Sequence, residues 1–345
     1  MSDDLYAGGA MDGAYVGKEN GWHMKGRTAN AAPKEAFEMF GIQPEYRSRL
    51  LMPDGSESPW AFVSRTNKQT GKLEIVSEPM RDTWTMITHA EAAELAEIAT
   101  GGALVETIGV LGEKTGDMLF MNFPLRELDI DGTPMKQYLY YINSLRVGYS
   151  SILGIGSVRW VCKNTMELGL ASARALYKTP HRAGVMIDTA DWIREVWETS
   201  GKRADEIVFA ARRLQTIPLS VETFEGILKV AMPDMGEAKP TGSVKRDEMA
   251  AHDRALYAER MASWRSQIVA LYEGAGTGMD LPTTEGMAWG GLNAVCEWLD
   301  HYRPAGGKNQ KDLVKVGVAR TEMAFIGESF RIKNKAAQML LKLGK

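Results

Sequence analysis

Four strand-like runs separated by short turns occupy residues 103–162, and they constrain the fold more than any other part of the sequence. The turns at residues 112–116 and 129–134 are too short for the crossover connection that joins parallel strands. We therefore expect neighbouring strands to pair antiparallel as a meander. A helix is expected over residues 164–177, directly after these strands.

Helix signals flank this sheet on both sides. Thr88 and Glu91 fit a capping box, and the Ala/Glu-rich helix that they open stops at Gly101. Ser220 is a predicted cap, and a break is expected at residues 200–201. The other expected helices cover residues 33–40, 190–214, 221–230, 247–272, 284–301 and 320–343. The predicted fold class is α+β, with an antiparallel meander packed on helices and a helical C-terminal half.

Composition divides the chain of 345 residues into four segments. Residues 1–58 are rich in Gly, Pro and polar residues and indicate a loosely structured N-terminal arm. Residues 59–187 hold the α+β core, which begins with alternating, strand-like residues. Residues 188–302 are the helical region, and residues 303–345 form a basic C-terminal tail and helix.

Overall composition excludes several classes of protein. Hydrophobic residues make up 44% and charged residues 25%, as in soluble globular proteins. The net charge of -3 excludes a uniformly basic nucleic-acid binder. Two cysteines, Cys162 and Cys296, exclude a disulfide scaffold and a multi-cysteine zinc module. With neither a long apolar run nor a secretory signal, the expected location is cytoplasmic, away from membranes.

Charge is distributed unevenly along the chain. Residues 88–131 contain nine acidic and two basic residues, whereas residues 141–182 contain six basic and one acidic. Residues 301–345 contain ten basic and three acidic residues. The acidic and basic segments can meet between subunits, the basic ones can face phosphate, or all can be solvated faces without a partner.

The basic segment around residues 143–182 carries the candidate ligand-binding site. In a strand through residues 158–163, Arg159 and Lys163 share one face, and Arg174 and Lys178 are four apart on the helix that Asn164 caps. The helix amides at Asn164 suit a phosphate. The predicted DNA-binding residues are Arg146, Arg159, Lys163, Asn164, Arg174, Lys178 and Arg182, with Tyr140 and Tyr149 for stacking. Cations interleaved with aromatics suit single-stranded DNA, although tyrosines are also ordinary strand residues.

Catalytic and cofactor motifs are weak throughout. The Gly154-Ile155-Gly156 run lacks the third glycine of a dinucleotide fingerprint, and no two histidines have the spacing of a zinc helix. Asp188, Asp191 and Glu195 lie near a helix start, where acids favour the helix dipole. We therefore predict no catalytic residue, no metal site and no cofactor.

Residues 158–182 (VRWVCKNTMELGLASARALYKTPHR) resemble a family of phage/plasmid-like proteins of unknown function found on mobile elements. That family has a vRvVC-NT junction followed by a histidine, here His181, and the likeness spans roughly residues 20–301. One departure is that Asn143-Ser144 is followed by Leu145, where the family often has His-Asp-Gly. The resemblance implies mobile-element DNA metabolism. A remote similarity to single-strand annealing proteins of the RecT, Erf and Rad type implies a β-β-β-α-like core in an oligomeric ring, with DNA in a basic groove. The expected order of strands at residues 103–162 and a helix at 164–177 is compatible with that core and with other α+β folds.

The function expected from the sequence is single-stranded DNA binding or annealing in recombination, by a homo-oligomer that does not hydrolyse nucleotides. This function needs no catalytic residues, and the sequence leaves open whether the protein is an enzyme. Two alternatives remain open. The first is a protein-binding factor that inhibits host restriction or defence. The second is a nuclease that uses Asp188, Asp191 or His181 with Mg²⁺.

Overall fold

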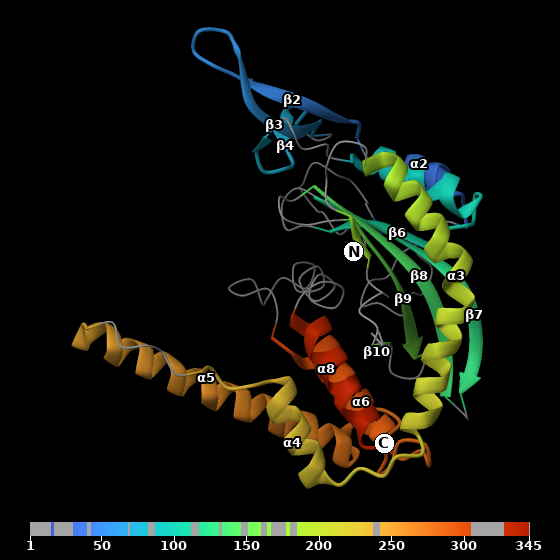
Figure 1. Cartoon of the computed structure of the whole chain (residues 1–345), viewed down its shortest axis with the longest axis vertical. Coiled ribbons are helices and arrows are strands. Elements are labelled where there is room, and N and C mark those ends of the chain that lie inside the picture. Colours follow the sequence, from blue (N-terminus) through green and yellow to red (C-terminus); the bar gives the residue numbers. More distant parts are fainter. Residues whose placement is uncertain are drawn as a thin grey trace.

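A computed structural model describes residues 15–16, 30–39, 43–67, 70–81, 87–111, 117–130, 133–145, 151–159, 164–166, 177–179, 185–236, 242–304 and 328–344. Within these ranges the N-terminal half holds two antiparallel sheets and the C-terminal half is helical (Figure 1). The predicted α+β class, with a meander followed by helices, is confirmed.

The larger sheet has seven strands in the order β1-β6-β7-β8-β9-β10, with β11 also paired to β9. Its strands are β1 (Tyr15–Val16), β6 (Thr107–Leu111), β7 (Met118–Ile130), β8 (Thr133–Ser144), β9 (Ser151–Arg159), β10 (Asn164–Met166) and β11 (Tyr177–Thr179). The four strands from β6 to β9 pair in sequence order, and each pair is antiparallel. They form the meander that the short turns predict.

The smaller sheet precedes the meander. Its strands are β2 (Glu45–Leu51), β3 (Glu57–Thr66), β4 (Leu73–Ile75) and β5 (Met80–Arg81). β3 is central, since β2, β4 and β5 all pair with it antiparallel. The boundary expected after residue 58 falls inside β3, so the hairpin of β2 and β3 joins part of the expected arm to the core.

The helices are α1 (Pro33–Met39), α2 (His89–Thr100), α3 (Val185–Leu214), α4 (Val221–Ala231), α5 (Val244–Ala270), α6 (Ala288–Glu297) and α8 (Glu328–Lys342). Short π-helical turns, η1 (Leu271–Ala275) and η2 (Trp298–Tyr302), follow α5 and α6. The break expected at residues 200–201 is wrong, because α3 runs through it. Tertiary packing along α3 outweighs the helix propensity lost at one glycine, about 1 kcal/mol.

The predicted ends of α2 are confirmed in detail. The hydroxyl of Thr88 accepts a hydrogen bond from the backbone amide of Glu91 at 3.3 Å, and the Glu91 carboxylate accepts one from the amide of Thr88 at 2.7 Å. Gly101 ends the helix in the left-handed region, with φ of 66°. The Ser220 cap of α4 is likewise present. Local capping chemistry therefore fixes these ends.

The helix expected over residues 164–177 is wrong at both ends. Asn164–Met166 is strand β10 and Tyr177–Thr179 is strand β11, and both pair with β9. The described part of β9 ends at Arg159, which pairs with Asn164, and residues 160–163 lie outside the described ranges. Pairing satisfies the backbone groups of β9, and this gain outweighs the cap signal of Asn164. Residues 167–176 lie outside the described ranges.

Helix α3 covers one face of the larger sheet (Figure 1). Trp197 of α3 packs edge-on against Phe123 of β7, with ring centroids 5.9 Å apart. The amide of Gln137 in β8 donates to the carbonyl of Ala204 in α3 at 3.0 Å. At the C-terminal end, Trp289 and Trp298 are buried, as their helical spacing predicts.

The molecule has two projecting parts. The hairpin of β2 and β3 extends from one end and α5 from the other, while α4, α6 and α8 lie beside the base of α5 (Figure 1). Among the described residues, no helix has the length and apolar composition needed to cross a membrane.

Candidate functional site

The predicted cationic site is placed only in part. Arg146, Tyr149, Lys163, Arg174 and Arg182 lie outside the described residues.

For Arg159, Asn164 and Lys178 the structure places the backbone alone. Arg159 pairs directly with Asn164, so the fold brings these two positions together. Lys178 pairs with Ile152 near the other end of β9. At roughly 3.3 Å per residue, Lys178 and Arg159 are about 23 Å apart along the sheet. The strand pairing therefore separates Lys178 from the other two positions.

Tyr140 lies in the core of the larger sheet. It is 2% exposed, and its ring crosses Gly154 on the neighbouring strand so closely that a Cβ there would be 2.4 Å from the ring. Tyr138 and Tyr141 are also buried. Burial raises the pKa of the Tyr141 phenol well above its usual value. These three tyrosines fit the ordinary strand-residue interpretation, and the burial of Tyr140 leaves no ring face for a base.

The cation of β8 is held by internal carboxylates. Lys136 Nζ lies 2.5 Å from Glu106 and 3.4 Å from Glu127, and it stands over the Tyr138 ring. The hydroxyl of Tyr138 donates to Glu106 at 2.9 Å. A phosphate would have to displace these carboxylates, so Lys136 is part of the internal packing.

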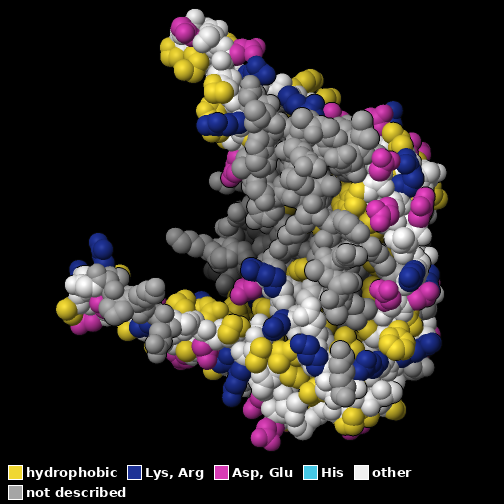
Figure 2. All heavy atoms as spheres, in the orientation of Figure 1, with side chains coloured by type: hydrophobic (Ala, Val, Ile, Leu, Met, Phe, Trp, Pro, Cys, Tyr) yellow, Lys and Arg dark blue, Asp and Glu magenta, His cyan; other side chains and the backbone are white. Residues whose placement is uncertain are grey.

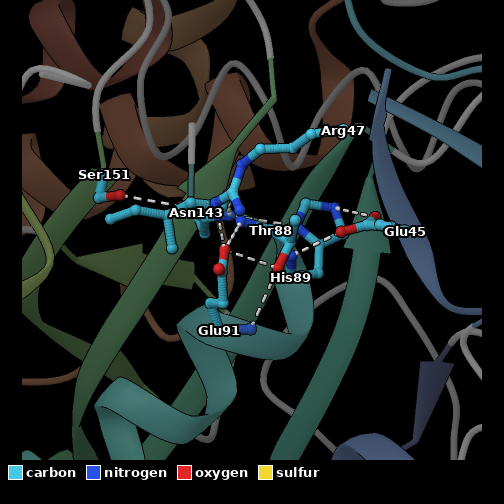
Figure 3. Close-up of polar contacts among 8 residues, drawn as sticks. Glu45, Arg47, Thr88, His89, Glu91, Asn143 and Ser151 are labelled. Carbon is cyan, nitrogen blue, oxygen red and sulfur yellow. Dashed lines mark hydrogen bonds and ion pairs between the residues drawn. The ribbon is translucent and has the colours of Figure 1, made fainter. Parts of the chain in front are cut away.

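A buried polar network joins the two sheets (Figure 3). The backbone amide of His89, at the start of α2, donates to the Glu45 carboxylate at 2.6 Å. The side-chain amide of Asn143 in β8 donates to the carbonyl of Ile87 at 2.9 Å and lies 3.2 Å from His89 Nδ1. Ser151 Oγ in β9 donates to Asn143 Oδ1 at 3.0 Å.

This network is structural in character. His89, Asn143 and Ser151 are fully buried, and Arg65 lies 3.8 Å from Glu45 with no exposed side-chain surface. Buried polar groups cost free energy unless they are paired, so each one restricts where the others can lie. On the surface, Arg47 forms an ion pair with Glu91 at 2.6 Å. Together these contacts fix the smaller sheet against α2 and the larger sheet.

One face of the smaller sheet carries several exposed apolar side chains, although Ser64 near its centre is buried. Tyr46 of β2 is 52% exposed and Trp60 of β3 is 42% exposed. Strand register and alternation place on this side, hereafter the aromatic face, Tyr46, Ser48, Trp60, Phe62, Ser64, Thr66, Leu73, Ile75 and Arg81. It contains one cation and no carboxylate. The opposite side carries Val63 and Met80, which are buried with Val76 and Leu145.

The sequence of β3 predicts that side chains alternate between two faces of a sheet, but it does not predict which face is exposed. Alternation shows that two faces differ, but not which one another layer covers. The signal was present in Trp60 and Phe62, which are two residues apart, but their exposure depends on pairing with β2 and β4.

Acidic residues considered for metal or catalysis have structural partners. The Asp300 carboxylate is buried and lies 2.6 Å from Lys333 Nζ, and Asp191 pairs with Arg194 at 2.9 Å. The described part of the chain contains no group of three or more His, Cys, Asp or Glu residues that could hold a metal ion. Cys162 and His181 lie outside that part, and only the backbone of Asp188 is placed.

Comparisons with known proteins identify the family of this chain. A search of curated proteins and a search of solved structures each found no match. The model of a family described as a domain of unknown function, DUF932, matches residues 73–331, about three quarters of the chain. This match includes β4, β5, the meander and most of the helical half. The chain belongs to the DUF932 family.

Proposed function

We propose that this protein binds single-stranded DNA in the DNA metabolism of mobile elements, and that it promotes annealing without nucleotide hydrolysis. The observation that carries the proposal is the aromatic face of the smaller sheet. Three aromatic side chains lie on one side of an antiparallel sheet, two of them more than 40% exposed. The resemblance of residues 158–182 to mobile-element proteins supports the same function.

The spacing of the aromatic face suits stacked bases. Trp60 and Phe62 are same-side neighbours on β3, roughly 6.6 Å apart, and Tyr46 lies diagonally across on β2. Stacking on such rings contributes about 1–3 kcal/mol per base and accepts any base, because every base has a π face. Annealing requires this tolerance, since the base edges must stay free to pair.

Charge on the aromatic face is compatible with a polyanion. Arg81 pairs with Trp60 across β3 and β5, so a cation stands beside the exposed indole. No carboxylate lies on this side to repel phosphates. The predicted cations of residues 143–182 remain part of the proposal as further phosphate contacts. Each such contact releases counterions, so we expect binding to weaken steeply with salt.

The test is fluorescence anisotropy with a labelled single-stranded oligonucleotide. We expect the double variant Trp60→Ala with Tyr46→Ala to bind at least tenfold more weakly, because two stacking contacts are lost. The matched control is Phe209→Ala, which removes a 70% exposed aromatic side chain from α3. If the double variant binds as tightly as the parent, the aromatic face is not the site.

The cation contribution is tested separately with Arg159→Ala and Lys163→Ala together. We expect weaker binding and a salt slope that is reduced by about one for each lost contact. Unchanged binding and an unchanged slope would exclude these residues from the DNA site while leaving the aromatic face intact.

A second candidate is a protein-binding factor, such as an inhibitor of host defence. Leu73 and Ile75, 60% and 52% exposed, favour it, because aliphatic side chains beside aromatic ones are typical of protein interfaces. Failure to bind any oligonucleotide, together with co-purification of a host protein that Leu73→Asp abolishes, would establish this function instead.

A further inference from the structure

An open groove lies between α4, α5 and α8, at the end of the molecule opposite α2 (Figure 1). Its volume is about 380 Å³, within the range of ligand pockets. Most of its lining is apolar: Met261 of α5 and Ile332 of α8 are buried at its base, and Val230 of α4 is 49% exposed beside it. Tyr257 and Trp264 of α5 are half-buried along it, and the Arg260 guanidinium lies 5.1 Å from the Tyr257 ring.

The rim of this groove is basic. Arg331 and Lys335 are exposed and one turn apart on α8, and Lys342 continues the same side of the helix. Two carboxylates near the rim are neutralised, since Glu328 pairs with Arg303, and Asp234 pairs with Arg265 at 2.9 Å. Arg331 and Lys335 form no ion pair within the described part of the chain. We call the groove with these two residues the basic groove.

The same molecule carries an acidic surface of complementary character. Glu35, Glu38 and Met39 of α1 are exposed, and so are Glu94 and Ile98 of α2. These five residues form what we call the acidic corner. Ile98 is 57% exposed and lies one turn after Glu94 on the outward side of α2. The amide of Lys34 donates to Glu97 at 2.9 Å, which holds α1 against α2.

Figure 1 places α2 and α8 towards different ends of the molecule. In the same orientation, Figure 2 shows Lys and Arg side chains over the region of α8. Surfaces of opposite charge at opposite ends of one chain cannot meet within that chain. They can meet between copies that are arranged head to tail.

We propose that the basic groove binds the acidic corner of a second copy of this chain. Ile98 of one copy packs against Val230, Tyr257 and Trp264 of the next. Glu94 faces Arg331 and Lys335. The apolar lining favours this occupant over a nucleic acid, because a phosphate backbone cannot bury an apolar surface. An isoleucine flanked by acidic residues can contact both the apolar lining and the basic rim. Each copy uses two different surfaces, so the contact repeats and forms a ring or a filament.

This assembly is independent of DNA binding and is measured without oligonucleotide, by size-exclusion chromatography with light scattering on the full chain. We expect the parent to have a mass that is a multiple of 38.1 kDa and falls as salt screens the ion pairs. Arg331→Glu with Lys335→Glu should give the single-chain mass. The matched control, Lys202→Glu with Arg246→Glu, reverses two exposed cations elsewhere and should keep the parent mass. Circular dichroism confirms that each variant is folded.

A mixing experiment tests the head-to-tail arrangement. The corner variant Glu94→Lys with Ile98→Asp should also be a single chain. When it is mixed with the groove variant, one intact groove meets one intact corner, and a species of two chains should appear. A parent that stays a single chain at every concentration, a groove variant that keeps the parent mass, or a mixture that forms no such species would each overturn the proposal. A groove variant that loses oligonucleotide binding but keeps its mass would point to a polyanion instead.

Discussion

The two sheets of this protein use aromatic side chains in opposite ways. In the larger sheet Tyr138 and Tyr140 are covered and help to form the core, whereas Tyr46 and Trp60 in the smaller sheet are exposed. Both sheets are antiparallel and both carry aromatics at alternating positions. The difference lies in the layers that pack on each sheet, so aromatic content alone does not separate a binding face from a core.

The largest expected effect on the free energy of unfolding comes from the buried aromatics of the larger sheet. Tyr140→Ala removes a fully packed ring above Gly154, and we expect the free energy of unfolding to fall by about 3–5 kcal/mol, as for other large aromatic truncations. Urea denaturation followed by circular dichroism measures it. A loss below about 1 kcal/mol would mean that the ring is not part of the core.

The next effect concerns the junction between the sheets. His89→Ala removes the imidazole beside Asn143 and Glu45 and takes one buried polar contact from each of them, so we expect a loss of about 1–3 kcal/mol. Hydrogen exchange should accelerate in β2 and β3 more than in β7 and β8. Equal acceleration in both sheets would contradict a junction that holds the smaller sheet in particular.

The buried Tyr141 of the larger sheet should also make the stability of the protein depend on pH. Burial raises the pKa of Tyr141 above that of an unfolded tyrosine, so at alkaline pH the unfolded state loses this proton first. The contribution of Tyr141 to the free energy of unfolding is complete below about pH 10. Above that pH it falls, by up to about 1.4 kcal/mol per pH unit. Tyr141→Phe should therefore show a shallower alkaline decline in thermal stability than the parent. A decline of equal slope would show that Tyr141 ionises equally in both states.

The smallest expected effect on the free energy of unfolding comes from the aromatic face of the smaller sheet. Trp60→Ala alone should change the free energy of unfolding by less than about 0.5 kcal/mol, because little of the surface lost is part of a core. Chemical denaturation beside Tyr140→Ala gives the contrast directly. A cost comparable to that of Tyr140→Ala would mean that the aromatic face is packed in solution, and it would remove the basis for base stacking.

Features governed by neighbours in sequence were predictable. Thr88, Glu91 and Gly101 define α2 through local hydrogen bonds, and short turns define the meander. The helix expected from Asn164 failed because an Asn can either cap a helix or begin the return strand of a hairpin, and here Asn164 pairs back with Arg159. The candidate site was less predictable, since the exposure of Trp60 and the burial of Tyr140 depend on layers contributed by distant segments.

The buried network was also beyond sequence patterning. His89, Asn143 and Glu45 come from three separate segments, and none of them has a motif that specifies the others. Their proximity follows from how α2 packs between the sheets, which is a property of the whole fold.

The same network bears on how the chain is synthesised. The β2–β3 hairpin leaves the ribosome early, but Ser151 follows Glu45 by more than one hundred residues. Until Asn143 and Ser151 have emerged, the hairpin can contact α2 through Glu45 and Arg47 but lacks its connection to the larger sheet. The apolar side chains of the hairpin are then exposed to solvent and can aggregate with other chains. A nascent chain stalled before residue 143 should therefore be the form that most needs a chaperone.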